Sequence, residues 1–487
     1  MAETTVRKQE TKREIGLFYA IMIALNGAVG IEVFVLLNYA VFLAGPAVVL
    51  SLLLSGTINI LTMLSFCELG AAIPEVGGDY TYAKVAYGGV IAFLIGWLRW
   101  ISSTFGATLA AIGFAALLTY FIPVNIPLIA VAIVIVFTLI SVRGIKEADA
   151  ATVLIALAIL TAFVVFGLGH GFQPRAFQPF TPKGLPGIFA ATTYSFVMFI
   201  GARATVAAAS RIKEPGKNVP RAILFSSLVI VILYCLMAYV TVGFTPKGDL
   251  LNPDFPFLTQ AAKVIMGDVG GALITIAGMF AAITSLTTSM MVQSSIVRGL
   301  SRDGYFPKFL LTRHKRFGTP HIAIIINSAF LVLFAATGVI QFVGYVAGFA
   351  ALTGFALVNL TLIKLRKEKP LLKRPFKAPL YPFAPILGII MSIALLVFVE
   401  ASASILMFEF IVLALIVYYL RMTGFHRLRV AVGGINLGLV GFMALLLYLT
   451  EIGLVPLAIP SPVLYALIFI LLVYTLAGIL NLLTKVR

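Results

Sequence analysis

The first long apolar segment contains Asn26-Gly27-Ala28-Val29-Gly30-Ile31-Glu32-Val33-Phe34, a stretch that interrupts it with two glycines and a carboxylate. A continuous membrane helix gains nothing from these residues, because glycine costs about 1 kcal/mol relative to alanine and a mid-bilayer charge costs about 3 kcal/mol or more. Unwound backbone at membrane depth is tolerated only where it is buried in protein or lines a cavity. We therefore predict a broken helix whose backbone forms half of a binding site.

The composition identifies an integral membrane protein. Of 487 residues, 61% are hydrophobic and 11% are charged, a balance that no soluble core explains. Apolar stretches recur at about the 20 residues that a bilayer requires. The predicted spans are fourteen, near 16–43, 47–73, 90–121, 126–142, 150–169, 188–210, 222–244, 269–297, 320–340, 342–364, 383–400, 402–420, 429–450 and 462–484.

The net charge of +17 follows the membrane topology. If both termini are cytoplasmic, 29 of the 35 Lys and Arg residues lie on the cytoplasmic side, as the positive-inside rule requires. The exceptions are Arg175, Lys183, Lys247 and Lys263 outside, and Arg99 and Arg203 within spans. The charge therefore needs no nucleic-acid partner, and we expect a multi-pass protein of the cell membrane. Glu68 and Asp149 lie near cytoplasmic span ends, where caps or loop ion pairs are expected.

Cysteine and histidine indicate neither a disulfide framework nor a metal site. Cys67 and Cys235 both fall inside predicted spans, and the four histidines lie at span ends or in loops. The chain also shows no HExxH, no phosphate-binding loop and no pair of nucleophile and base. We expect no cofactor, no bound metal and no enzymatic activity. The expected partners are the lipid bilayer and a small molecule.

A second interruption, Phe199-Ile200-Gly201-Ala202-Arg203, lies near the middle of the sixth apolar segment. Glycine and charge again stand where an unbroken span would have neither. Interruptions in the first and sixth segments are typical of two five-helix repeats of inverted topology, whose broken helices meet at the bilayer midplane. The sequence thus predicts an all-α membrane fold with spans 1 and 6 broken.

Several motifs carry a family resemblance. The succession VGIEVF from Val29, AGPA from Ala44, CELGAAIPEVGGDYTY from Cys67 and GWLRW from Gly96 resembles the opening of the amino acid, polyamine and organocation transporter family. Further matches are RGIKEAD at 143–149, EPGKNVPRAI at 214–223, SRDGYFPK at 301–308 and RPFKAPLYP at 374–382. The resemblance extends to about residue 420, and it implies the leucine-transporter fold. A layout of fourteen spans resembles the cationic amino acid transporter branch.

The resemblance also implies a division of the chain and a function. We expect a cytoplasmic arm at 1–15, a transport core of ten spans at 16–364, a cytoplasmic loop with two spans at 365–420, and two additional spans at 421–487. The last two spans would serve peripheral packing or contact in a homodimer. The implied function is secondary active transport of amino acids or related organic amines by alternating access.

In the family, backbone N–H groups of the first break bind the substrate carboxylate, and the second break contacts its amine and side chain. The matching positions here are Val29, Gly30, Ile31, Glu32, Phe199, Ile200, Gly201, Ala202 and Arg203. Two of them depart from the family pattern, because Glu32 replaces a usual glycine and Arg203 stands where glutamate is common. These opposite charges would lie in adjoining segments, and an ion pair between them is the natural inference.

Three interpretations of this pair remain open, and they do not exclude one another. The two charges could neutralise each other, or bind a zwitterion with Arg203 on its carboxylate and Glu32 on its amine. Alternatively, Glu32 could couple transport to protons, and Arg203 is a second candidate for coupling. Glu32 would also repel an anionic group at the first break, which keeps polyamines and inorganic cations as alternative substrates.

Coupling to an ion is less visible in the sequence. The fifth span contains no lysine, so the lysine-based coupling of some family members is not expected. A sodium ion would need hydroxyls and carbonyls, and Ser285 and Thr288 of the eighth span are the candidates, opposite the carbonyls of Ala28 and Val29. Small hydroxylated residues are also ordinary packing material in membranes. Proton coupling, sodium coupling and exchange therefore all remain open.

Overall fold

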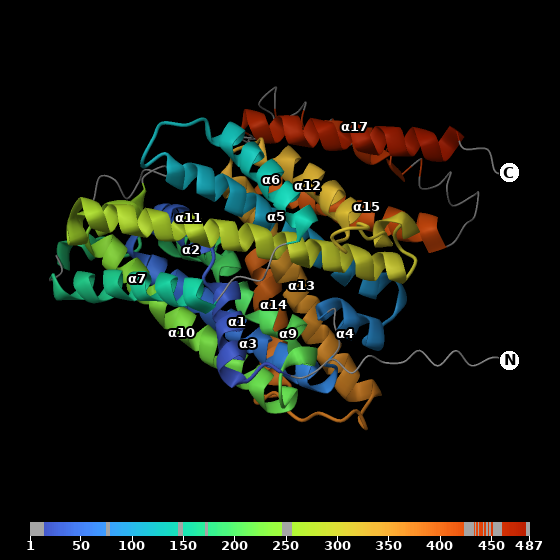
Figure 1. Cartoon of the computed structure of the whole chain (residues 1–487), viewed down its shortest axis with the longest axis horizontal. Coiled ribbons are helices and arrows are strands. Elements are labelled where there is room, and N and C mark those ends of the chain that lie inside the picture. Colours follow the sequence, from blue (N-terminus) through green and yellow to red (C-terminus); the bar gives the residue numbers. More distant parts are fainter. Residues whose placement is uncertain are drawn as a thin grey trace.

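The computed structural model describes residues 14–74, 78–144, 150–170, 174–245, 256–422 and 460–483, with scattered positions between 433 and 450. In these residues the regular structure is helical apart from one isolated parallel bridge between Ile15 and Ile212. Figure 1 shows the helices packed side by side in a single bundle. Nine helices of the described part are long and apolar enough to cross a membrane, and four more are apolar but shorter. The prediction of an all-helical membrane protein is confirmed.

The first apolar segment is broken as predicted. Helix α1 (Leu17–Ala28) ends before the break, and α2 (Glu32–Ala44) begins directly after it. Between them, Val29 leaves helical geometry with φ −86° and ψ 76°. Gly45 then turns the chain with a positive φ of 61°, and α3 (Val48–Ala72) returns across the bundle. The two glycines and the carboxylate therefore mark a real interruption.

The sixth segment is also interrupted, but in a different form. Helix α8 (Gly184–Ser195) passes into the 3-10 helix η3 (Phe196–Arg203), followed by α9 (Ala204–Ala207) and η4 (Ala209–Arg211). A 3-10 helix is tighter than an α-helix and is often found where a helix is strained or hinged. At this break the backbone therefore continues as a 3-10 helix, whereas at the first break it leaves helical geometry.

The remaining helices complete the bundle. They are α4 (Asp79–Ala86), α5 (Gly89–Leu118), α6 (Ile126–Arg143), α7 (Ala150–Gly169), η2 (Pro174–Phe177), α10 (Pro215–Gly243), α11 (Phe257–Arg302), η6 (Lys308–Leu311), α12 (His321–Ala335), α13 (Ile340–Glu368), α14 (Phe383–Leu396), α15 (Ala401–Met422) and α17 (Ser461–Leu483). Helix α11 is longer than the predicted span 269–297, because it includes polar residues at both ends and a kink at Gly267. Residues 1–13, Asp149 and most of the predicted span 429–450 lie outside the described residues.

Packing places the two interrupted segments at the centre. Helix α1 packs against α10 and η3, α2 packs against α8, and α5 packs against α11 and α13. Around the first break, Ile31, Val33, Leu36 and Leu37 are fully buried.

On one side of the bundle, two backbone hydrogen bonds join the start of α1 to the end of the sixth segment. Ile15 N–H donates to the Arg211 carbonyl at 3.1 Å, and Lys213 N–H donates to the Ile15 carbonyl at 2.8 Å.

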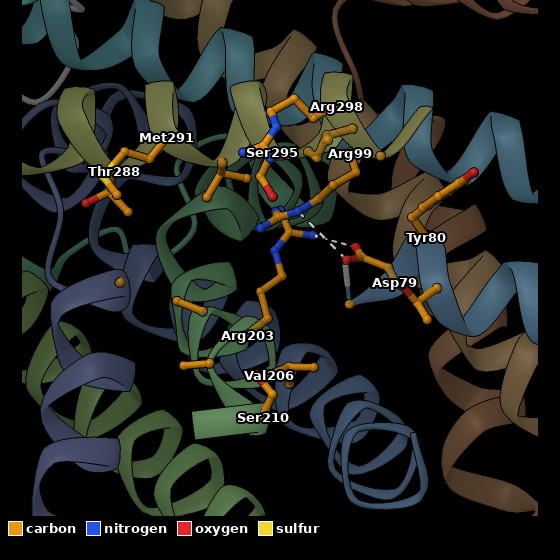
Figure 2. Close-up of a pocket in the computed structure, with 18 of the residues that line it drawn as sticks. Asp79, Tyr80, Arg99, Arg203, Val206, Ser210, Thr288, Met291, Ser295 and Arg298 are labelled. Carbon is orange, nitrogen blue, oxygen red and sulfur yellow. Dashed lines mark ion pairs between the residues drawn. The ribbon is translucent and has the colours of Figure 1, made fainter. Parts of the chain in front are cut away.

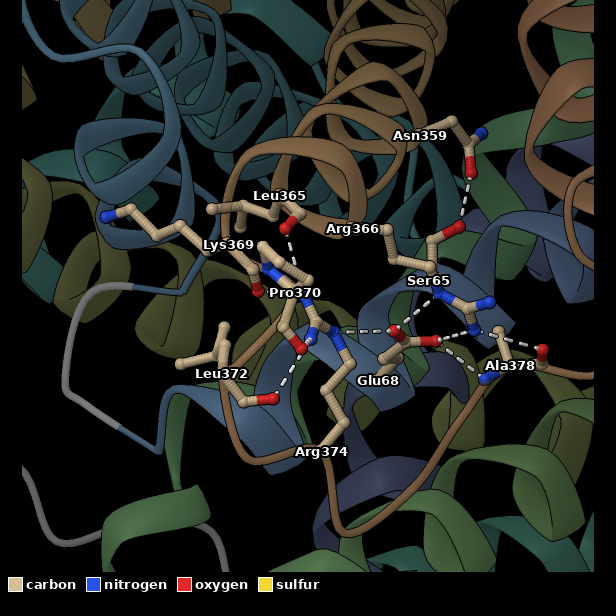
Figure 3. Close-up of polar contacts among 10 residues, drawn as sticks. All are labelled: Ser65, Glu68, Asn359, Leu365, Arg366, Lys369, Pro370, Leu372, Arg374 and Ala378. Carbon is tan, nitrogen blue, oxygen red and sulfur yellow. Dashed lines mark hydrogen bonds and ion pairs between the residues drawn. The ribbon is translucent and has the colours of Figure 1, made fainter.

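A buried carboxylate fixes the loop between α13 and α14 against α3 (Figure 3). Glu68 accepts hydrogen bonds from Arg366 Nε at 2.9 Å and Nη2 at 2.5 Å, and from the backbone N–H of Ala378 at 2.7 Å. Arg374 Nε lies 3.2 Å from the same carboxylate. The ion pair expected for Glu68 near a cytoplasmic loop is confirmed.

Candidate functional site

The two interrupted segments touch backbone to backbone at Gly27 and Gly201. A Cβ atom added at Gly201 would overlap the Gly27 carbonyl and lie 2.5 Å from the Ala28 nitrogen. A Cβ atom added at Gly27 would overlap the Gly201 carbonyl oxygen. Only glycine allows this approach, since the obstructing atoms are backbone and cannot rotate away. The structure therefore brings the two predicted halves of the site together.

At the first break, the protein itself occupies the backbone donors. Ile31 N–H donates to Ser285 Oγ at 3.3 Å, and Glu32 stands in the first turn of α2. That carboxylate lies over Gly30, where an added Cβ would overlap it. The N-terminus of a helix favours negative charge, so Glu32 in the first turn of α2 supplies an internal anion there.

Tyr234 connects the two breaks. Its hydroxyl donates to the Ala28 carbonyl at 2.7 Å, and its ring lies 5.6 Å from the ring of Phe199 in η3. Phe199 and Ala202 are buried, and Ile200 is half-buried. In this structure the Ala28 carbonyl, predicted as a sodium ligand, accepts a hydrogen bond from a tyrosine instead. Ser285 does face the break, as predicted.

At the second break, Arg203 points towards Asp79 and Arg99 (Figure 2). Arg203 Nη1 lies 3.7 Å from Asp79 Oδ2, and Arg99 Nε lies 3.8 Å from Asp79 Oδ1. Arg203 Nη2 also donates to Ser102 Oγ at 3.4 Å. The inferred ion pair between Glu32 and Arg203 is wrong, because Asp79 is the carboxylate partner of Arg203 in the described structure.

A cavity of about 930 Å³ extends from the second break to the surface. Its wall includes Asn26 and Gly27 of the first break, Arg203 of the second, and Thr288 of α11, whereas Val29, Gly30, Ile31, Glu32 and Phe199 are not part of it. The charged residues in the wall are six basic and two acidic, namely Lys84, Arg99, Arg203, Arg211, Arg298, Arg302, Asp79 and Asp303. Lys84 is 53% exposed and Arg302 is exposed, so the cavity reaches solvent beside α4.

On the side of α2 and α8, three tyrosines fill the space between the helices. The Tyr194 ring lies 4.9 Å from both the Tyr39 ring and the Tyr345 ring, and Tyr39 lies 6.3 Å from Tyr345. Tyr194 is fully buried and Tyr345 is nearly so. Edge-on aromatic contacts of this kind pack densely and exclude water. The described structure is therefore open beside α4 and packed at the opposite end.

Comparison with known proteins identifies the family. The family model described as "Amino acid permease" matches residues 15–417. The chain belongs to the amino acid permease family. It is therefore a membrane transporter rather than an enzyme, and the sequence-based family resemblance is confirmed.

Three relatives of the permease carry names that refer to different substrates. The branched-chain amino acid permease of Bacillus subtilis is 26% identical, over 85% of this chain and 94% of its own length. The methylthioribose transporter of the same species is 27% identical, over 78% of this chain and 87% of its own length. The chloroplastic cationic amino acid transporter 9 of Arabidopsis thaliana is 28% identical, over 62% of this chain and 57% of its own length. Their names differ in substrate class, so family membership alone does not give the substrate.

Sequence reasoning missed two residues of the permease's cavity. Asp79, which begins α4 directly after Gly78, was not singled out, and Arg99 was placed within a span without a role. An acidic residue at a helix start following two glycines was the available signal for a placed carboxylate. Among the described residues, no group of three or more His, Cys, Asp and Glu could hold a metal ion.

Proposed function

We propose that the permease is a secondary transporter that moves amino acids or related organic amines across the cell membrane by alternating access. One observation carries the proposal, the backbone contact of Gly201 with Gly27, because Gly27 lines a cavity that reaches solvent beside α4. A transporter needs a site between two gates that open in turn. The three tyrosines are suited to form the closed gate, and the cavity beside α4 is suited to form the open path.

The overall architecture in this proposal is the leucine-transporter fold with fourteen spans and both termini in the cytoplasm. The predicted transport core, residues 16–364, contains helices in both of its halves, and spans 1 and 6 are both interrupted. The positive-inside rule assigns the Lys84 side to the cytoplasm, so the structure represents an inward-facing state. We assign α17, at the edge of the bundle in Figure 1, to peripheral packing or homodimer contact.

The charges favour a zwitterionic substrate. The carboxylate of Glu32 has no ion-pair partner among the described residues, and it is suited to receive an amine near the first break. The cavity beside the first break carries six basic side chains, which would repel a polyamine or an inorganic cation. Those alternative cargoes are therefore less well supported than amino acids.

Glu32 is also the strongest candidate for coupling. A half-buried carboxylate with no cationic partner can exchange a proton as access alternates between the two sides. Ser285 beside the first break and Thr288 in the cavity wall are the candidates for a sodium ion, and exchange would require neither. We propose proton coupling through Glu32, which predicts that an inward proton gradient increases uptake and that Glu32→Gln abolishes this increase.

The test of the proposed function is uptake of labelled amino acids and organic amines into proteoliposomes containing the purified permease. Gly201→Ala should abolish uptake, because its Cβ would meet the backbone of Gly27. Gly354→Ala is the matched control, since nothing lies within 4 Å of a Cβ added there. The proposal fails if no compound of the panel is transported, or if Gly201→Ala transports as well as Gly354→Ala.

A further inference from the structure

The first break is poorly suited to hold a substrate carboxylate. Ile31 N–H already donates to Ser285, and the Glu32 carboxylate, in the first turn of α2, lies over Gly30. A second anion would lie beside the Glu32 carboxylate, and the repulsion between the two is strongly unfavourable in a water-poor site whenever Glu32 is ionised. A substrate carboxylate must therefore find its donors elsewhere.

Arg99 and Arg203 offer such donors in the cavity wall. Their side chains are 16% and 6% exposed, and they share the single carboxylate of Asp79 at 3.8 and 3.7 Å. These distances exceed the roughly 2.7–2.9 Å of a charge-assisted hydrogen bond. Two guanidinium groups with one loosely held carboxylate leave one positive charge and several N–H donors facing the cavity (Figure 2).

We propose that Arg99 and Arg203 form the carboxylate-binding site of this permease, in place of the backbone of the first break. The position of Asp79 indicates where a substrate carboxylate would bind, because the Asp79 carboxylate itself lies between the same two guanidinium groups. One added carboxylate neutralises the cluster, and the planar guanidinium matches carboxylate geometry with two parallel hydrogen bonds. The ligand class is thus a zwitterion whose carboxylate enters from the cavity. This inference rests on the proposed function, since it concerns the recognition of the same substrate.

The first test compares amino acids with their carboxamides. L-Leucine and L-lysine represent the two side-chain classes named among the relatives, and L-leucinamide and L-lysinamide lack the carboxylate. Ligand binding to the folded state raises the thermal midpoint. In the wild type we expect about tenfold weaker binding of the carboxamide, because charge-assisted hydrogen bonds are lost. Arg99→Gln and Arg203→Gln should remove this preference, and Lys217→Gln, at an exposed side chain, should retain it.

Other outcomes overturn the inference without touching the proposed function. A carboxylate preference that survives in both arginine variants and disappears in Ser285→Ala would place the carboxylate at the first break. Equal binding of acid and carboxamide by the wild type would mean that no carboxylate is recognised at all. If uptake of every compound also fails, the proposed function itself is wrong.

A second test does not depend on knowing the substrate. Asp79→Asn removes the tethered carboxylate and leaves Arg99 and Arg203 without it. Sodium acetate should then raise the thermal midpoint of Asp79→Asn more than sodium chloride does at equal concentration. This difference should be absent from the double variant with Arg203→Gln. An equal response of Asp79→Asn to acetate and chloride would overturn the assignment of a carboxylate site.

Discussion

Replacing Arg366 by glutamine should destabilise the permease strongly, because the carboxylate of Glu68 is fully buried and depends on its partners. The substitution removes two charge-assisted hydrogen bonds, at 2.9 and 2.5 Å. Arg374 and the Ala378 N–H remain, the former at 3.2 Å. Breaking a buried ion pair from one side typically costs about 3–5 kcal/mol, since it leaves an uncompensated charge. The remaining arginine places the expected loss of unfolding free energy near the lower limit, about 3 kcal/mol.

The assay is unfolding of the detergent-purified protein by heat or denaturant, with two comparison variants. Lys364→Gln removes a charge from the same helix, but its pair with Glu368 is partly exposed and should contribute less than about 1 kcal/mol. The double variant Glu68→Gln with Arg366→Gln should recover part of the loss, because the unpaired charge is gone. Equal stability of Arg366→Gln and Lys364→Gln would refute the reasoning.

Three further predictions concern the site. Gly30→Ala should reduce uptake at least several-fold while the protein still folds, because its Cβ meets only the flexible end of Glu32 and the Ser285 hydroxyl; uptake and thermal unfolding of one preparation check both parts. Phe199→Ala should destabilise the protein by about 3–5 kcal/mol through loss of a buried ring, and denaturant unfolding measures this loss. Tyr345→Ala should open the packed end, so that a membrane-impermeant thiol reagent reaches Tyr194→Cys only in that background.

The sequence predicted the backbone interruptions well, because their causes are local. Glycine and charge disfavour a membrane helix wherever they occur, so Gly30 and Gly201 were informative without any knowledge of the fold. Neither the 3-10 form of the second break nor its contact with the first, between Gly201 and Gly27, could be predicted. Such a contact joins residues far apart in the chain, and its geometry is set by packing.

The charge pairing was predicted less well. Opposite charges in adjoining segments suggested that Glu32 and Arg203 meet, but the sequence did not reveal that α4 would bring Asp79 into the cavity. The position of the Glu32 carboxylate could have been foreseen, since an acidic residue in the first turn of a helix interacts favourably with the helix N-terminus. Pairing across the bundle needs coordinates, whereas interactions within one turn can be read from sequence.

Alternating access through this cavity is tested most directly by the accessibility of two introduced cysteines in membrane vesicles of known orientation. Asn26→Cys lies in the cavity wall, and Tyr39→Cys lies in the tyrosine cluster, each in a background without Cys67 and Cys235. We predict that a membrane-impermeant maleimide labels Asn26→Cys only from the cytoplasmic face. A transported substrate should change the two labelling rates in opposite directions, because one gate closes as the other opens. Labelling of Asn26→Cys from the external face, or parallel changes at both cysteines, would contradict the account.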